Sequence, residues 1–379
     1  MPLPGASCRI EVGAGARPRP RRWTEPVNTN WPRCFQTIRA GASPALTLYF
    51  RKMRLIRHPV LCNYYVTYRC NAKCAFCDIW EKPSPYIGLA DVERNLNDLK
   101  KLGVRVIDFT GGEPLLHRQL PDFLALAKGL GFITTVTTNG LLYPKNAEKL
   151  CGLVDMLHFS LDSADRATHD LGRGVACYDF VLESIRVARK LGERPDILFT
   201  VFRKNLADLA VVYEQITQPN GLVLILNPAF EYNAVDTGER LTDDELNYLS
   251  AFGRKKGVYL NEGFIQLRRD GGNHIAAPVC RAASTTLVIS PHNELVLPCY
   301  HLGQQKFPIN GQLFDLYNST EVRGLAALEG RLPACEGCTI NCYMQPSFAV
   351  ETSKYFWKAL PSTLRYNWEK GTWKRLVGV

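Results

Sequence analysis

The chain alternates between two hydrophobic patterns from about residue 60 to residue 230. Short β-branched or apolar runs are each followed by a turn and then by a segment with apolar residues at helical spacing. The predicted strands are Asn63 to Tyr68, Arg105 to Thr110, Ile133 to Thr138, Met156 to Leu161, Ile197 to Phe202 and Leu222 to Asn227. The predicted helices are Leu89 to Leu102, Leu120 to Leu130, Pro144 to Leu153, Tyr178 to Lys190 and Leu206 to Gln215. This alternation predicts an α/β fold with a parallel sheet, a partial (β/α)6 TIM-like barrel.

The pattern changes after about residue 230. A helix is predicted over Thr242 to Lys255 with Thr242 as its N-cap, and short strands follow near Thr285 to Ser290 and Glu294 to Leu297. We therefore expect an irregular N-terminal extension at 1–55, a barrel at 56–235, a small C-terminal module at 236–346 and a basic, aromatic tail at 347–379. The tail is expected to pack on its own barrel, with covering of a substrate pocket and peripheral membrane contact as alternatives.

Composition narrows the classes of protein that fit. No run approaches the roughly 20 apolar residues of a membrane-spanning helix. The start carries Arg among prolines and no secretory pattern. Thirteen cysteines in tight clusters favour metal ligation in a reducing compartment over disulfides, so we expect a cytoplasmic protein. The net charge of +10 lies partly in the irregular start, so we expect a solvated surface and no nucleic-acid partner.

Three cysteines lie close together directly after the first predicted strand. Cys70, Cys74 and Cys77 form a C-x3-C-x2-C segment. Closely spaced thiolates suit iron–sulfur or zinc binding. A zinc site normally has a fourth nearby Cys or His, and this loop contains none. Three ligands leave one iron of a cluster open.

This segment, with the aromatic Phe76 just before its last cysteine, resembles the signature of the radical S-adenosylmethionine (radical SAM) superfamily. The resemblance implies a [4Fe–4S] cluster held by Cys70, Cys74 and Cys77, with SAM on the open iron. It also implies cleavage of SAM to a 5′-deoxyadenosyl radical that abstracts hydrogen from an unactivated C–H bond. A one-electron reductant of the flavodoxin or ferredoxin type is the implied partner.

Three later strand ends resemble the family's SAM-binding turns. Gly111-Gly112-Glu113-Pro114 matches its GGEP segment, where glycines allow the backbone to approach a ligand and Glu113 can pair with the ammonium of SAM. Thr137 to Gly140 and Ser160 to Ser163 resemble the turns after the third and fourth strands, and Arg173 lies within reach of the SAM carboxylate. Val201 and Phe202 are candidates to flank adenine, with core packing as the alternative. The candidate SAM-binding residues are Phe76, Gly111, Gly112, Glu113, Pro114, Asn139, Ser160, Asp162 and Arg173, and no catalytic residue is identified.

A second cysteine set lies in the C-terminal module. It comprises Cys280, Cys299, Cys335, Cys338 and Cys342. A structural zinc bound by four of the five is one interpretation. The set also resembles the SPASM or twitch extensions of radical SAM enzymes, which implies one auxiliary iron–sulfur cluster with four of these five as ligands.

The match to the SPASM pattern is incomplete. Further cysteines of the full pattern are missing, which argues against a second auxiliary cluster. Glu294 replaces the usual glycine, beside Asn293, which can adopt a left-handed turn. His301 adds a nitrogen close to Cys299, although a lone histidine in a loop is more often just exposed.

An auxiliary cluster suits net oxidation of a small-molecule substrate, so we expect an oxidoreductase. Cys77-Asp-Ile-Trp80 and the run from Cys335 to Pro346 resemble radical SAM enzymes of anaerobic phototrophs that modify bacteriochlorophyll precursors. This resemblance implies a tetrapyrrole substrate, with hydroxylation of the C-7 methyl of a bacteriochlorophyllide. A SPASM-type maturase of a peptide or protein residue is the second hypothesis, and a non-catalytic zinc-binding scaffold is the third.

Overall fold

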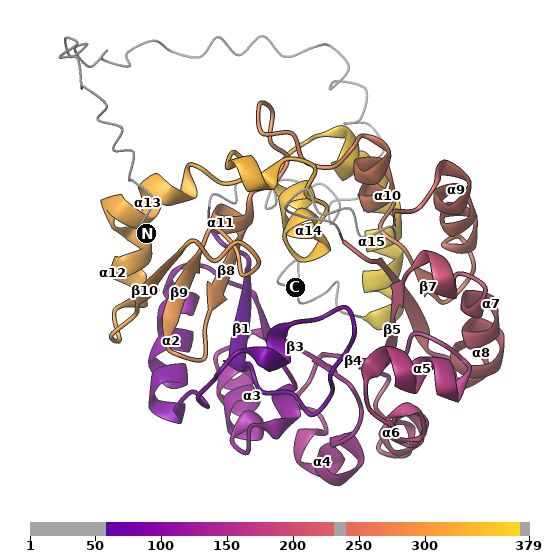
Figure 1. The fold of residues 1–379 in the computed structure, drawn as a ribbon. Coiled ribbons are helices and arrows are strands. Elements are labelled where there is room, and N and C mark those ends of the chain that lie inside the picture. Colours follow the sequence, from indigo (N-terminus) through magenta and orange to yellow (C-terminus); the bar gives the residue numbers. More distant parts are fainter. Residues whose placement is uncertain (1–57, 231–239, 372–379) are drawn as a thin grey trace, which may run out of the picture. The chain divides into compact units, whose positions relative to one another are not determined.

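A computed structural model describes residues 58–230 and 240–371, so the expected N-terminal extension lies outside the described residues. Ten strands of the described part form one sheet in the order β10-β9-β8-β1-β2-β3-β4-β5-β6-β7 (Figure 1). The pairs from β8 to β7 are parallel, and β9 and β10 are added antiparallel. The strands are β1 Leu61–Thr67, β2 Val106–Gly111, β3 Ile133–Thr138, β4 Met156–Ser160, β5 Asp196–Val201, β6 Val223–Pro228, β7 Val258–Tyr259, β8 Thr286–Ile289, β9 Glu294–Leu297 and β10 Gln305–Pro308.

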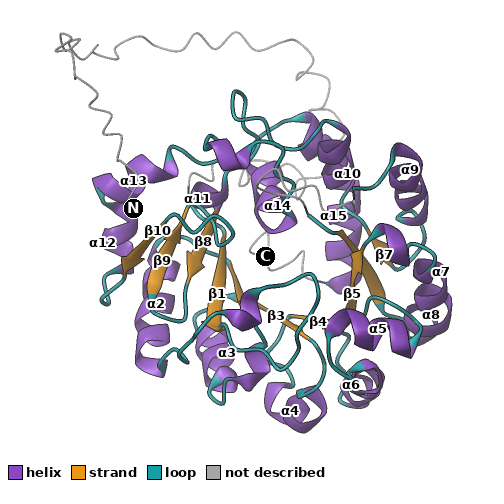
Figure 2. Cartoon of the chain, in the orientation of Figure 1, coloured by secondary structure: helices purple, strands orange, loops and turns teal. Residues whose placement is uncertain are grey.

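Helices cover the outer face of the curved parallel sheet, as Figure 2 shows for the helices that follow the first five strands. These are α2 Leu89–Lys101, α3 Leu120–Gly129, α4 Tyr143–Leu150, α5 Arg166–Arg173, α6 Tyr178–Lys190, α7 Asp208–Val212 and α8 Gln218–Asn220. The C-terminal part adds α9 Asp243–Phe252, α10 Glu262–Arg269, α11 Ala282–Thr285, α12 Leu313–Asn318, α13 Thr320–Ala326, α14 Asn341–Val350 and α15 Lys354–Lys370.

The predicted partial barrel is present. Each of the six predicted barrel strands lies within two residues of its observed ends, and Thr242 is the N-cap of α9, where its hydroxyl accepts from Glu245 N. The helix expected over Leu206 to Gln215 is α7 followed by a π-helical turn at Tyr213–Thr217. α5 was not predicted from the sequence. Its buried residues are His169 and Arg173, so no apolar residues recur at helical spacing along it.

The C-terminal module shares the barrel's sheet. β8 pairs in parallel with β1, with Leu61 opposite Thr286, and β9 and β10 continue outward from β8. The expected boundary near residue 235 lies outside the described residues, and because the described parts before and after it share one sheet, the division into separate parts stays a prediction. Asn293 does adopt a left-handed conformation, with φ of 59°, in the turn between β8 and β9.

The two faces of the barrel strands differ in exposure. On β2, Ile107 and Phe109 are fully buried in the core under the helices, whereas Val106, Asp108 and Thr110 keep partial exposure. The same alternation occurs on β4, β5 and β6. Because successive side chains point to opposite faces of a strand, the partly exposed ones face the space that the strands enclose. We call this space the barrel interior, and it is open to solvent.

Helices α14 and α15 lie across the open side of the barrel, between β8 and β7 (Figure 1). α15 contacts α10, α14 and β7, and Tyr366 Oη donates to Asp196 Oδ2 at 2.7 Å. The aromatic tail therefore packs on the barrel as expected, although Trp368 is 72% exposed. None of the described helices is long and apolar enough to cross a membrane.

Candidate active site and second cysteine site

The three clustered cysteines lie on the loop that leaves the carboxyl end of β1. Cys70, Cys74 and Cys77 are partly buried and free of disulfides. Burial, foremost, and the neighbouring charges of Glu113, Cys74 and Cys77 raise the pKa of Cys70 to about 11. The three thiols therefore lie close enough together to act on one another, which fits a three-thiolate metal site. Their arrangement on one loop agrees with the sequence analysis.

Two glycines allow neighbouring segments to pack closely against the backbone of this loop. A Cβ on Gly112 would lie 2.2 Å from the carbonyl oxygen of Arg69, and a Cβ on Gly174 would lie 2.3 Å from that of Lys73. Gly111 also packs closely against β1, with a Cβ position 2.0 Å from Thr67 O, and its expected approach to the ligand stays a prediction. The glycines of the GGEP segment are thus needed for contact with the cysteine loop and its strand.

Glu113 joins two of the predicted SAM-binding turns. Its Oε1 accepts from Leu115 N and Thr138 Oγ1, at 3.1 and 2.8 Å, and its Oε2 accepts from Asn139 N at 2.9 Å. Burial raises the pKa of Glu113 to about 7, against the lowering effect of these bonds. Pro114 begins the short 3-10 helix that follows. The expected contact between Glu113 and the ammonium of SAM stays a prediction.

A second turn contact reaches the cysteine loop itself. The Asn139 Nδ2 donates to Asn71 Oδ1 at 2.8 Å, which connects the turn after β3 to the loop. Sequence reasoning missed Asn71, because nothing distinguishes it from the other polar residues of the loop. Ser160 is buried at the end of β4, as expected for a strand-end site.

Arg173 lies where the cysteine loop and the turn after β4 meet. Its Nη2 is 2.6 Å from Asp162 Oδ2, its Nη1 is 4.0 Å from Cys74 Sγ, and its guanidinium lies 5.3 Å from the centre of the Phe76 ring. Its Nε is buried without a hydrogen-bond partner among the described residues. A buried, unpaired cationic donor fits an anionic ligand such as the SAM carboxylate. Phe202 completes this corner, with its ring 5.2 Å from that of Phe76.

His169, Asp170 and Cys177 also place their ligand atoms within 4.8 Å of one another. His169 Nδ1 accepts from Asp162 N, and its Nε2 lies 3.3 Å from Cys177 Sγ. Asp170 Oδ1 accepts from the amides of Cys177 and Tyr178. Because each ligand atom already has a partner within the protein, we interpret this group as a support for Asp162.

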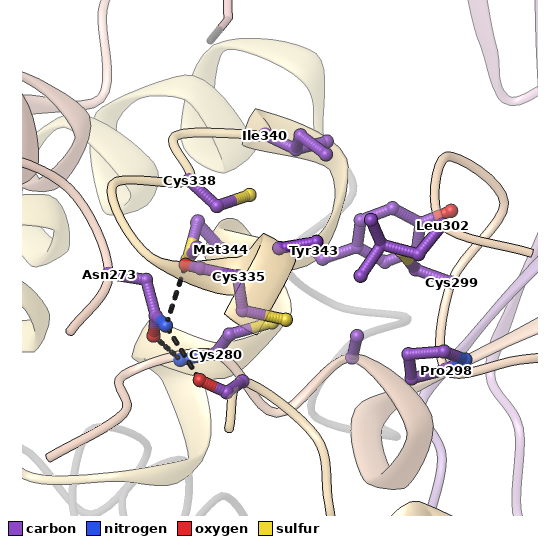
Figure 3. Close-up of a pocket in the computed structure, with 13 residues that line it drawn as sticks. Asn273, Cys280, Pro298, Cys299, Leu302, Cys335, Cys338, Ile340, Tyr343 and Met344 are labelled. Atoms are coloured by element: carbon purple, nitrogen blue, oxygen red, sulfur yellow. Dashed lines mark hydrogen bonds between the residues drawn. The ribbon is translucent and has the colours of Figure 1, made fainter. Parts of the chain in front are cut away.

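Four cysteines of the second set line one buried, mostly apolar cavity. These are Cys280, Cys299, Cys335 and Cys338, with Ile340 and Met344 among the apolar residues around them (Figure 3). Burial raises the pKa of all four thiols, to about 12 for Cys299 and about 11 for Cys338. Burial therefore disfavours the charged form of each thiol. A bound cation would favour the thiolates, so the donor set fits a four-thiolate metal site.

Asn273 ties the segments of this second site together. Its side-chain Oδ1 accepts from Cys280 N, and its Nδ2 donates to the carbonyls of Gly330 and Cys335 (Figure 3). The same Oδ1 also accepts from Val279 N. Its backbone N–H also donates to Cys338 O at 3.0 Å. The side chain is 0% exposed. Asn273 carries no pattern that sequence reasoning could detect, since its partners are distant in the chain.

Two other candidates lie outside the second site. Cys342 does not line the cavity. Desolvation of its thiol and then the charge of Asp108 raise its pKa to about 11, so the thiol lies near the Asp108 carboxyl group although the residue as a whole is exposed. His301 is surrounded by the rings of Phe230, Tyr300 and Tyr343, and its burial lowers its pKa to about 4. Neither is placed to complete the four-cysteine set.

Comparison with known proteins decides the family. Residues 64–216 match the model of the Radical SAM superfamily. The chain is 30% identical over 216 residues to a probable GTP 3′,8-cyclase of Methanopyrus kandleri, which covers 52% of this chain and 69% of that protein. The chain belongs to the radical SAM superfamily. Its cofactors are a [4Fe–4S] cluster and SAM, and the cysteine triplet and the unpaired Nε of Arg173 fit them.

Other similarities are more partial. The chain is 28% identical over 159 residues to Fe-coproporphyrin III synthase of Methanosarcina barkeri, which covers 40% of each protein. It spans 36, 40 and 46% of the length of the first three curated relatives it matches. The crystal structure of Streptococcus suis SuiB bound to S-adenosylmethionine aligns with a TM-score of 0.58 at 18% identity, over 73% of this chain and 69% of SuiB. This likeness shows the shared radical SAM fold.

Proposed function

We propose that this radical SAM enzyme is an oxidoreductase that oxidises an unactivated C–H bond. The observation that carries the proposal is the second cysteine site, where four cysteines line one buried cavity. Bound at the two sites, the cofactors supply a 5′-deoxyadenosyl radical for hydrogen abstraction and an acceptor for the second electron. Net oxidation needs such an acceptor, whereas isomerisation does not.

The chain's own residues then have distinct roles. Cys70, Cys74 and Cys77 hold the catalytic cluster, while Arg173 Nε donates to the carboxylate of SAM. Glu113 keeps the turns after β2 and β3 in register through its three accepted hydrogen bonds. The open barrel interior receives the substrate beside these turns, because the active sites of such barrels lie at the carboxyl ends of the strands.

Cys280, Cys299, Cys335 and Cys338 are the proposed ligands of one auxiliary cluster. They line the same cavity, and Asn273 forms hydrogen bonds with the backbone of three of the four, Cys280, Cys335 and Cys338. Cys342 is excluded because it is not part of the cavity lining. A zinc ion suits the same four thiols, and metal analysis separates the two possibilities.

Anaerobic reconstitution with iron and sulfide tests the proposal. The wild type is expected to bind about eight irons per chain, as two four-iron clusters, and to form 5′-deoxyadenosine from SAM under dithionite. The triple Ala variant of Cys70, Cys74 and Cys77 should keep about four irons and lose SAM cleavage. A colourless protein that holds zinc and does not cleave SAM would contradict the proposal.

A matched pair of serine variants identifies the auxiliary ligands. Cys338→Ser removes a thiol from the cavity and should lose most of the auxiliary iron, whereas Cys342→Ser should keep it. The two substitutions are chemically identical and only four residues apart on the chain. Equal iron loss in both variants would show that the ligand assignment is wrong.

For the substrate, we propose the C-7 methyl of a bacteriochlorophyllide, which two hydroxylations convert to a formyl group. Two features support a tetrapyrrole: the resemblance at Cys77 to Trp80, and a curated relative named Fe-coproporphyrin III synthase. A reductant of the flavodoxin or ferredoxin type would deliver the electrons.

Incubation of the reconstituted enzyme with SAM, reductant and a C-7-methyl bacteriochlorophyllide tests this substrate. Mass spectrometry should detect first the hydroxymethyl pigment and then the formyl pigment, with 5′-deoxyadenosine formed in proportion. SAM cleavage without any change in the pigment would leave the oxidoreductase proposal intact and reject this substrate.

A further inference from the structure

Asp108 is a carboxyl group inside the barrel that none of the assigned roles uses. It lies in the middle of β2, on the partly exposed face, opposite Asn63 of β1 and Thr135 of β3 in the sheet register. Its strand neighbours Ile107 and Phe109 point the other way, into the helix-covered core. The carboxyl group therefore faces the barrel interior, three residues before the GGEP segment.

The contacts of Asp108 leave it available. Thr135 Oγ1 donates to its Oδ1, and no ion pair to its carboxylate occurs in the part of the chain that the structure describes. The titratable groups close enough to interact with it are the thiols of Cys342, from α14, and Cys62, from β1. Both are neutral at ordinary pH, because burial raises their pKa values.

A carboxyl group inside a barrel that serves only stability normally has a cationic partner or several hydrogen-bond donors. Asp196, at the start of β5, shows that arrangement in the same barrel: Lys370 Nζ and Tyr366 Oη donate to its two oxygens at 2.9 and 2.7 Å. Asp108 has one donor. Burial raises its pKa to about 6, against the lowering effect of Thr135, which suits a group that takes up a proton near neutrality.

We propose that Asp108 accepts the proton released when the substrate carbon is oxidised in the barrel interior. The inference rests on the proposed oxidoreductase function. For a hydroxylation, the carbon gives one hydrogen atom to the SAM-derived radical and one electron to the acceptor at the second cysteine site. A water oxygen bonds to the carbon, and the proton that this water loses goes to the carboxylate of Asp108.

The first test needs no substrate. Infrared difference spectra of the holoenzyme are recorded across pH 5 to 8 for the wild type and for Asp108→Asn. The wild type should show a carboxyl band that disappears near pH 6 and that the variant lacks. A carboxyl that stays protonated to pH 8 has no basic form to accept a proton, and this result would overturn the inference.

The second test measures coupling, with the C-7-methyl bacteriochlorophyllide as the probe. Asp108→Asn should keep its iron, bind the pigment before reductant is added with an affinity within about threefold of the wild type, and still form 5′-deoxyadenosine. The ratio of oxidised pigment to 5′-deoxyadenosine should fall at least about a hundredfold, the usual contribution of a proton acceptor. An unchanged ratio refutes the role of Asp108.

Controls separate this inference from the function on which it rests. Asp122→Asn makes the same change on the exposed surface of α3 and should leave every readout unchanged. If the wild type cleaves SAM but does not bind the pigment, the proposed substrate is wrong, and the infrared titration alone decides whether Asp108 can act as a base. If Asp108→Asn loses its iron, the infrared titration is repeated on Thr135→Val, which lacks the hydrogen bond to Asp108. A pH of Asp108 titration equal to that of the wild type would count against the inference.

Discussion

Replacing Gly112 by Ala is expected to displace the cysteine loop. The new Cβ would lie 2.2 Å from Arg69 O and 2.4 Å from Tyr68 O. Both neighbours are backbone atoms, so no flexible side chain can move aside. The same contact region carries two hydrogen bonds of 2.9 Å, from Gly112 N to Thr67 O and from Glu113 N to Arg69 O.

The size of the effect follows from this geometry. Restoring an ordinary contact distance requires the loop and the GGEP segment to separate by about 1 Å, since close carbon contacts normally lie well beyond 3 Å. Overpacking of this kind costs about 1–3 kcal/mol, and each weakened hydrogen bond adds about 1 kcal/mol. A shift of about 1 Å at reacting groups lowers rates roughly a hundredfold.

The assay compares Gly112→Ala with Gly172→Ala. Gly172 lies in α5 beside the same loop, and an added Cβ there meets nothing within 4 Å. Both variants are reconstituted anaerobically, and iron content and the rate of 5′-deoxyadenosine formation are measured. Gly112→Ala should lose about a hundredfold in rate, whereas Gly172→Ala should match the wild type. If Gly112→Ala keeps a third or more of the wild-type rate, the argument from close packing is wrong.

Three further outcomes are expected. Glu113→Gln places a side-chain NH2 group against a backbone N–H donor, so it should lower the free energy of unfolding by about 1–3 kcal/mol and weaken SAM binding. Chemical denaturation measures the first effect and SAM titration the second. An unchanged denaturation midpoint would contradict this expectation. Asn273→Ala leaves buried backbone groups around the second cysteine site without hydrogen-bond partners, so the auxiliary iron content should fall while SAM cleavage continues. The control variant Asn318→Ala, at an exposed position, should keep all its iron. Thr135→Val removes the bond that lowers the pKa of Asp108, so the acid limb of the pH–rate profile should move about one unit above pH 6; a shift to lower pH would refute the assignment.

Much of the candidate site was predictable from local sequence. The strand–helix alternation predicted the partial barrel because periodicity reports which face of each element is buried. The spacing of Cys70, Cys74 and Cys77 predicted a loop with three candidate ligands, since neighbouring thiols on one short loop must lie close in space. The GGEP segment was recognised by its residues, although its glycines turn out to contact the cysteine loop.

Only the tertiary structure decided which distant residues share a site. Five cysteines were equivalent candidates in the sequence, and folding brings Cys280, Cys299, Cys335 and Cys338 to one cavity, which Cys342 does not line. Asn273 and Asp108 were invisible beforehand because their roles depend on backbone groups and strands that lie far away along the chain. The sequence by itself determined the local elements and the loop of three clustered cysteines, whereas long-range packing determined which of the later cysteines share a cavity and which side chains line the barrel interior.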